Sequence, residues 1–285
     1  MTTAIPALNC RGKLLSLDQP RVMGILNITP DSFSDGGDFL SPQAAVERAR
    51  QMVEEGAAII DVGGESTRPG APAVSIQKEL DRIVPVIEVL SAELPVPISI
   101  DTSKPEVMRA AVAAGAGMIN DVRALRLTGA LEAAAELNRS LSVPICLMHM
   151  QGEPGTMQQQ PHYSDVVQEV SAFLAERVQA CVRHGIPRER LVVDPGFGFG
   201  KRLEHNLSLL KRLDELAKLG LPLMVGLSRK SMIGAVLDRP VTQRLYGSLA
   251  AAVLAVARGA VLVRVHDVRA TVEALKVYEA VKQSP

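Results

Sequence analysis

Polar side chains that could bind a ligand follow a series of short apolar runs in this chain of 285 residues. Asn27 follows the first run, Asp101 the third and Asp194 the sixth. The ends of the other runs carry Asp61, Asn120-Asp121, His149, the group 228–231 (Ser-Arg-Lys-Ser), and Arg264 with His266. One polar residue after a strand usually only caps the next helix. Carboxylates, amides and cations after nearly every run instead predict a binding site, if the runs end at the same place.

The arrangement of these runs predicts where they end. Eight runs (21–26, 57–62, 96–100, 117–119, 143–147, 191–193, 223–225 and 260–265) alternate with amphipathic stretches, for example 42–55, 76–93, 105–114, 164–184 and 205–219. Continuous apolar runs are typical of strands buried on both faces, and strand–helix alternation indicates a parallel sheet. We therefore predict an α/β fold, a single (β/α)8 TIM barrel over 21–283. Residues 1–20 would form an N-terminal extension or a short hairpin. In a barrel of this type all eight strand ends lie at the C-terminal rim, where active sites are built.

Composition excludes several other classes of function. The formal net charge is zero and the chain has no basic block, which argues against nucleic acid and against an anionic membrane surface as partners. No apolar run approaches the length of a membrane span, and no signal peptide opens the chain. The three cysteines are scattered and in no metal-ligand spacing, and Cys146 is expected to be a small buried residue. We expect a cytoplasmic protein.

The residue types at the predicted rim indicate two kinds of ligand group. Arg68, Arg264 and His266 favour an anion. Asp101, Asn120 and Asp194 supply hydrogen-bond acceptors, which a planar heterocycle with an amino group beside a ring N–H would match. Taken alone, Asp101 or Asp194 could instead form a structural hydrogen bond to a neighbouring loop. Neither a Walker nor a Rossmann glycine pattern is present. His149 lies between Met148 and Met150, which indicates packing, and we assign it no role.

Eight segments then resemble, in order, the signatures of the dihydropteroate synthase family. They are 24–37 (GILNITPDSFSDGG), 61–70 (DVGGESTRPG), 99–104 (SIDTSK), 119–121 (IND), 147–150 (LMHM), 194–201 (DPGFGFGK), 226–231 (GLSRKS) and 264–267 (RVHD). Together they extend across nearly the whole chain. The resemblance implies condensation of a pterin carrying a methylene diphosphate with the amine of 4-aminobenzoate, giving 7,8-dihydropteroate and diphosphate.

The resemblance also implies a role for individual residues. The pterin ring would contact Asp101, Asn120, Asp194, Lys230 and Arg264. The diphosphate would contact Asn27, Arg68, Arg264, Val265 and His266. The aminobenzoate pocket would comprise Phe33, Thr67, Pro69, Phe199, Lys230 and Ser231. Mg²⁺ would be the cofactor, bound by Asn27 and Asp35, and the catalytic residues would be Asp101, Lys230, Arg264 and His266.

The chemistry of these substrates favours a dissociative, SN1-like substitution. Diphosphate is a good leaving group once cations take up its charge, and the pterin can delocalise the positive charge left on the methylene carbon. Two alternatives stay open: a methyltransferase barrel that binds a methylated folate, and a non-catalytic pterin-binding paralogue. Members of the family are usually dimeric, so a homodimer is expected.

Overall fold

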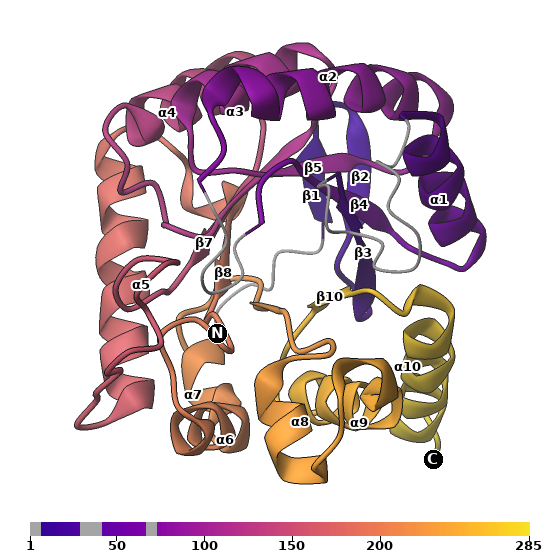
Figure 1. The fold of residues 1–285 in the computed structure, drawn as a ribbon, viewed down its shortest axis with the longest axis vertical. Helices are drawn as coiled ribbons and strands as arrows, with labels where there is room; N and C mark the ends of the chain where they lie inside the picture. Colours follow the sequence, from indigo (N-terminus) through magenta and orange to yellow (C-terminus); the bar gives the residue numbers. More distant parts are fainter. Residues whose placement is uncertain (1–6, 29–41, 67–72) are drawn as a thin grey trace.

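The chain forms a barrel of eight parallel strands surrounded by helices (Figure 1). The computed structural model describes residues 7–28, 42–66 and 73–285. Neighbouring strands are hydrogen-bonded in the order β8-β7-β6-β5-β4-β3-β10-β9. A parallel bridge between Val193 and Leu223 then connects the two ends of this sheet, and the amide of Val193 donates to the carbonyl of Pro222 (3.0 Å). The (β/α)8 prediction is therefore confirmed.

Each of the eight predicted runs overlaps one strand of the barrel. The strands are β3 (Arg21–Asn27), β4 (Ile59–Gly63), β5 (Ile98–Asp101), β6 (Met118–Asp121), β7 (Ile145–Met148), β8 (Leu191–Asp194), β9 (Met224–Val225) and β10 (Leu262–Val265). The polar residues at the ends of the runs belong to the last positions of several of these strands. Parallel direction therefore places them at one rim.

Helices follow each strand of the barrel. They are α1 (Pro42–Glu54), α2 (Ile76–Glu93), α3 (Pro105–Ala113), α4 (Ala130–Leu141), α5 (Val166–Arg183), α6 (Leu203–Lys211), α7 (Leu213–Ala217), α8 (Ser231–Leu237), α9 (Leu245–Val256) and α10 (Val268–Lys282), with short 3-10 turns at Arg188–Arg190 and Val241–Gln243. None of the helices in the described ranges combines the length and apolar character needed to span a lipid bilayer.

The amphipathic stretch 205–219 predicts a single helix, and this prediction is wrong. Two helices occupy this stretch, α6 and α7, and they are separated at Arg212. The Arg212 guanidinium bonds to Glu215 (2.7 Å) and to Asp165 at the start of α5 (3.1 Å). Leu213, the first residue of α7, is fully buried. Periodicity does not reveal the break, and one of the contacts of Arg212 is with a residue 47 positions away.

An apolar layer fills the barrel at the N-terminal ends of its strands. It comprises Met23, Ile59, Met118, Cys146, Val192, Met224 and Leu262. A hairpin of β1 (Ala7–Cys10) and β2 (Lys13–Ser16) precedes the barrel and packs Leu8, Cys10, Leu15 and Leu17 against this layer. The interior is therefore closed at this end by side chains from two separate pieces of structure.

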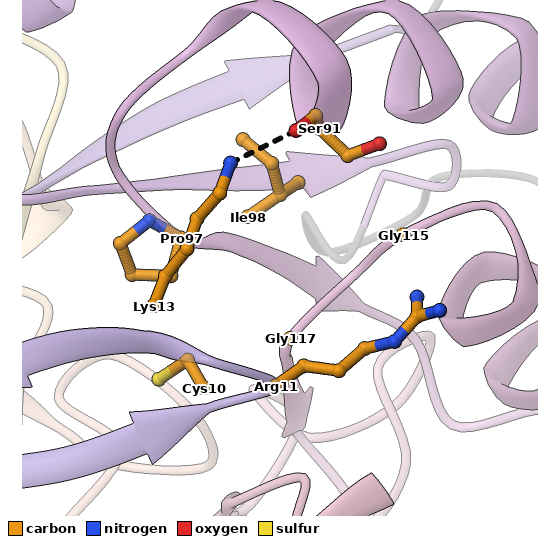
Figure 2. A pocket seen from close by; sticks show the side chains of 8 residues that line it. All are labelled: Cys10, Arg11, Lys13, Ser91, Pro97, Ile98, Gly115 and Gly117. Carbon is orange, nitrogen blue, oxygen red and sulfur yellow. Dashed lines mark hydrogen bonds between the residues drawn. The ribbon is translucent and has the colours of Figure 1, made fainter.

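Lys13 fastens the hairpin to the end of α2. Its ammonium donates to the carbonyls of Ser91 (2.9 Å), Leu94 (2.6 Å) and Val96 (3.4 Å). Figure 2 shows Lys13 reaching Ser91 across a cavity of about 260 Å³, which Arg11 borders on its other side. A cation suits the carbonyl-rich C-terminus of a helix. The lysine donors are thus used by the fold itself.

Candidate active site

Strand register brings polar residues together above the apolar layer. Asp101 on β5 is paired with Gly63 on β4 on one side and with Asn120 on β6 on the other. Asp61 lies one inward-facing position below Gly63 on β4, and Asp194 ends β8. All of these polar side chains are buried. The predicted convergence at the C-terminal rim is therefore present in the structure.

Arg264 on β10 reaches past β3 to carboxylates on β4 and β5. Its Nε donates to Oδ2 of Asp61 (2.6 Å), and one terminal amine donates to Oδ2 of Asp101 (2.7 Å). Asn120 Nδ2 also donates to Oδ2 of Asp61 (3.1 Å). Burial alone would lower the pKa of Arg264, but the two carboxylates outweigh this and raise it. The guanidinium is therefore permanently charged and held in one place.

Two buried carboxylate oxygens in this cluster lack a donor. Oδ1 of Asp61 and Oδ1 of Asp101 have no hydrogen-bond partner among the described residues. Burial raises the pKa of Asp101 to about 7, Arg264 opposes the rise, and the negative charge of Asp61 adds to it. A buried acceptor without a partner costs free energy. Both oxygens are therefore suited to a ligand that brings N–H groups.

Asp194 connects this cluster to the loop that follows β8. Its Oδ1 accepts from the amide of Gly196 (2.7 Å), and burial raises the pKa of its carboxyl to about 6. Further along the loop, the Phe199 ring lies under the ammonium of Lys230, whose Nζ is 4.1 Å from the ring centroid. This cation–π contact places two of the predicted site residues side by side.

His266 is held by Ser228 at the neighbouring rim position. The Ser228 hydroxyl lies 3.0 Å from Nδ1 of His266 and accepts from its backbone amide at 3.2 Å. Burial lowers the pKa of His266 to about 3, and the charges of Arg264 and Arg229 lower it further. The ring is therefore neutral. With the hydroxyl proton directed to Nδ1, the ring proton lies on Nε2, where it can donate to an anion.

Asn27 ends β3 beside the same space. A side chain at Gly63 would meet Asn27 Oδ1 at 3.5 Å and Asp101 Oδ2 at 3.9 Å, so the glycine leaves room between them. No group of three or more His, Cys, Asp or Glu side chains able to hold a metal occurs within the described residues. Five predicted site residues lie outside those residues: Phe33, Asp35, Thr67, Arg68 and Pro69.

Comparison with known proteins agrees with this geometry. Residues 23–266 match the family model described as "Pterin binding enzyme". The chain is also 56% identical to the dihydropteroate synthase of Escherichia coli strain K12 over 270 residues, covering 95% of this chain and 94% of that protein. The chain belongs to the dihydropteroate synthase family.

Solved structures of this family superpose closely on the chain. The dihydropteroate synthase of Xanthomonas albilineans with 4-aminobenzoic acid is 56% identical, with a TM-score of 0.92 and coverage of 99% of this chain and 100% of that one. The same enzyme in complex with 7,8-dihydropteroate gives a TM-score of 0.88 at 53% identity, with coverage of 98% and 100%. The fold and the family predicted from the sequence are both confirmed.

Two members of the cluster, Asp61 and Ser228, were predicted to lie at the rim but were given no individual role there. The available signal for Asp61 was a carboxylate inside an otherwise apolar strand, since such a group needs a buried partner. For Ser228, the sequence contained no signal that it would contact a residue 38 positions later.

Proposed function

We propose that this chain condenses a pterin that carries a methylene diphosphate with 4-aminobenzoate, releasing diphosphate and 7,8-dihydropteroate. The observation that carries the proposal is the buried layer of Asp61, Asp101, Asn120, Asp194 and Arg264 at the C-terminal rim. Its acceptors match a donor-rich ring. The relatives solved with 4-aminobenzoic acid and with 7,8-dihydropteroate support the same pair of substrates.

The pterin ring would lie on this buried layer. Its ring N–H and amino groups would donate to Asp101 and Asp194, and Asn120 would contribute from β6. Arg264 would pack over the ring face, and Lys230 would approach from the start of α8. The donors missing at Asp61 Oδ1 and Asp101 Oδ1 support a ligand with several N–H groups. Arg264 and Lys230 would serve different purposes, because the planar guanidinium of arginine stacks on a heterocycle and the ammonium of lysine does not.

The diphosphate would lie nearer to solvent, between Asn27, Arg68, Arg264, Val265 and His266. Val265 would contribute through its backbone, because its apolar side chain is buried. His266 would donate a hydrogen bond without adding a charge, which fits its lowered pKa of about 3. Arg264 would supply the positive charge, since its own pKa is raised.

Mg²⁺ would be held here only together with the substrate. Asn27 offers an amide oxygen and Asp35 a carboxylate, which are hard ligands of the type that this ion prefers. Bound there, the ion would neutralise diphosphate charge and make it a better leaving group.

The aminobenzoate would bind above the pterin, in a pocket of Phe33, Thr67, Pro69, Phe199, Lys230 and Ser231. The contact between Lys230 and the Phe199 ring supports a combined apolar and cationic wall, which suits a benzoate. Ser231, exposed at the first residue of α8, would face the carboxylate.

The substitution would follow a dissociative, SN1-like route. Arg264 and His266 would stabilise the charge of the departing diphosphate, and Lys230 would hold the pterin ring. Asp101 would stabilise the cationic pterin, because its ionised carboxylate lies against the ring. The aryl amine is unprotonated near neutral pH and attacks without a protein nucleophile. Exclusion of water from the buried layer would protect the cation from hydrolysis.

A homodimer is proposed through the surface of α8, α9 and α10. These helices lie beside one another (Figure 1), and they and the short 3-10 turn before α9 carry exposed apolar side chains, namely Val236, Leu237, Val241, Tyr246, Leu254, Val277 and Val281. Tyr246 is 82% exposed. An apolar surface of this kind typically marks an interface, and a second copy of the chain is its simplest partner. Light scattering of the wild type and of Tyr246→Asp would test this dimer, because the variant should have the mass of a monomer.

The location is proposed to be the cytoplasm. All three cysteines, Cys10, Cys146 and Cys181, are free and buried. Free thiols agree with a reducing compartment.

One assay tests the proposed reaction. Diphosphate release from the pterin diphosphate would be measured with and without 4-aminobenzoate and Mg²⁺. We expect diphosphate release, together with the product that contains aminobenzoate, only when 4-aminobenzoate and Mg²⁺ are both present. Failure to form any aminobenzoate-dependent product would contradict the proposal.

A further inference from the structure

Lys201, which has no part in the proposed reaction, is a buried ammonium surrounded by acceptors. Its side chain is 3% exposed. Nζ lies 2.9 Å from the carbonyl of Gly196, 3.0 Å from that of Phe199, 2.9 Å from Nδ1 of His149 and 3.4 Å from the His149 carbonyl. Three close acceptors match the three N–H groups of an ammonium, whereas a neutral amine has two. The arrangement therefore favours the protonated form of Lys201.

His149 presents its acceptor to Lys201 because the ring is neutral and fixed. Burial lowers the pKa of His149 to about 2, and the charge of Lys201 lowers it further. Nδ1 is thus free to accept and the ring proton lies on Nε2. The ring packs edge-on against Phe173 of α5, with 4.9 Å between centroids. The position of the acceptor is consequently set by the core.

The loop above this pair has a constrained backbone. Gly196, Gly198 and Gly200 have φ of +68°, +80° and +60°. A Cβ atom at Gly196 would lie 1.9 Å from the His149 carbonyl, and one at Gly200 would lie 2.4 Å from the Gln151 carbonyl. The loop therefore lies directly on the segment that carries His149, and two of its carbonyls turn inward to Lys201.

Separate anchors hold the two halves of this loop. Asp194 accepts from the Gly196 amide, which fixes the first half. In the second half, Asn206 accepts from the Gly198 amide (2.8 Å) and Tyr163 donates to the Gly200 carbonyl (2.8 Å). The carbonyl of Phe199, between these two glycines, bonds to Lys201. Lys201 thus holds the residue whose ring lies under Lys230.

Burying a charged lysine among neutral acceptors is costly. Burial lowers its pKa to about 7, because an ammonium loses much of its hydration here. The charge of Asp194 offsets part of this cost, although no carboxylate contacts Nζ directly. An apolar side chain would avoid the cost of burying a charge but would leave these acceptors without a donor. The ammonium therefore serves to hold the acceptors that surround it.

We propose that Lys201, supported by His149, is a positioning residue that holds Phe199 in the orientation required for aminobenzoate. Lys201 contacts neither proposed substrate. It acts through the carbonyls of the loop, one of which belongs to Phe199 itself. This inference rests on the proposed aminobenzoate site.

The test compares the KM for 4-aminobenzoate with the dissociation constant of the pterin diphosphate in the variant Lys201→Met. We expect the KM for 4-aminobenzoate to rise roughly tenfold, which corresponds to about 1.4 kcal/mol. The dissociation constant of the pterin diphosphate, measured by calorimetry, should change less than about threefold, or less than about 0.7 kcal/mol. Loss of general stability would instead lower the active fraction without separating the two constants. Equal changes in both constants, or none in folded Lys201→Met, would overturn the proposal.

A matched pair at His149 covers the case in which Lys201→Met does not fold. His149→Leu removes the acceptor but retains Lys201, and should raise the same KM. His149→Asn supplies a side-chain oxygen in place of Nδ1 and should restore it substantially. Phe199→Ala separates the contribution of the Phe199 ring to aminobenzoate binding from the positioning role of Lys201. A raised KM in Phe199→Ala, with unchanged constants in the Lys201 and His149 variants, would overturn the positioning role alone. No product from the wild type would contradict the proposed function.

Discussion

Nε of Arg264 lies 2.6 Å from Oδ2 of Asp61, although 203 positions separate the two residues in the chain. Asp101 accepts from the same guanidinium at 2.7 Å. One cation thus faces two buried carboxylates, and negative charge is left in excess within the cluster. This excess is what a cationic pterin would meet during the proposed reaction. The electrostatic environment exists before substrate binds, which is the condition for effective stabilisation of a transition state.

Asp101→Asn should separate turnover from binding. The amide retains the size of the side chain and an acceptor oxygen but removes the charge that would stabilise the cation. We expect kcat to fall roughly 100-fold, as for other losses of transition-state electrostatics. Pterin binding, measured by calorimetry, should weaken far less. Equal losses in turnover and in affinity would rule out the cation-stabilising role.

The pH dependence of kcat/KM should report the carboxyl of Asp101. Its pKa is raised to about 7, and the ionised form is the active one, so activity should fall as the pH drops through about 7. The charge of Asp61 contributes to the raised pKa. Asp61→Asn should therefore lower the pKa of Asp101 and move the acidic limb to lower pH. A limb that stays in place, or moves upward, would show that another group controls it.

Asn27 and Phe33 should affect different substrates. Asn27→Ala removes a proposed oxygen ligand, so the Mg²⁺ concentration for half-maximal rate should rise roughly tenfold, or about 1.4 kcal/mol. Phe33→Leu should instead raise the KM for 4-aminobenzoate and leave the metal titration unchanged. Each variant is the control for the other. Identical responses in both titrations would argue against this division.

Lys13→Met should reduce stability without reducing catalysis. The change leaves carbonyls at the end of α2 without their donor, and we expect a loss of about 1–3 kcal/mol in the free energy of unfolding. The active site lies at the opposite end of the barrel, so kcat should be unaffected. Leu14→Ser, at an adjacent side chain that is 72% exposed, is the control and should change stability little. Denaturant titration would measure both.

The strands were predictable from sequence because they are buried on both faces, which makes each one a continuous apolar run. Their shared direction then placed Asp101, Asn120 and Asp194 at one rim without further information. The break at Arg212 was not predictable, since its ion pair with Asp165 depends on how α5 and α6 pack. The same applies to Asp61, because the spacing of the strands along the sequence does not say which cation will contact it inside the barrel.

The hairpin of β1 and β2 has a consequence for the order of events in catalysis. With Leu8 and Leu15 packed beneath the apolar layer, the end of the barrel away from Asp101 is closed. Both substrates must then arrive from the same side. A ring that lies on the polar layer has to enter before a molecule that lies above it, and the joined product has to leave before the next ring can enter. The order of substrate binding and product release would thus be determined by the hairpin, which closes the end of the barrel that no substrate touches.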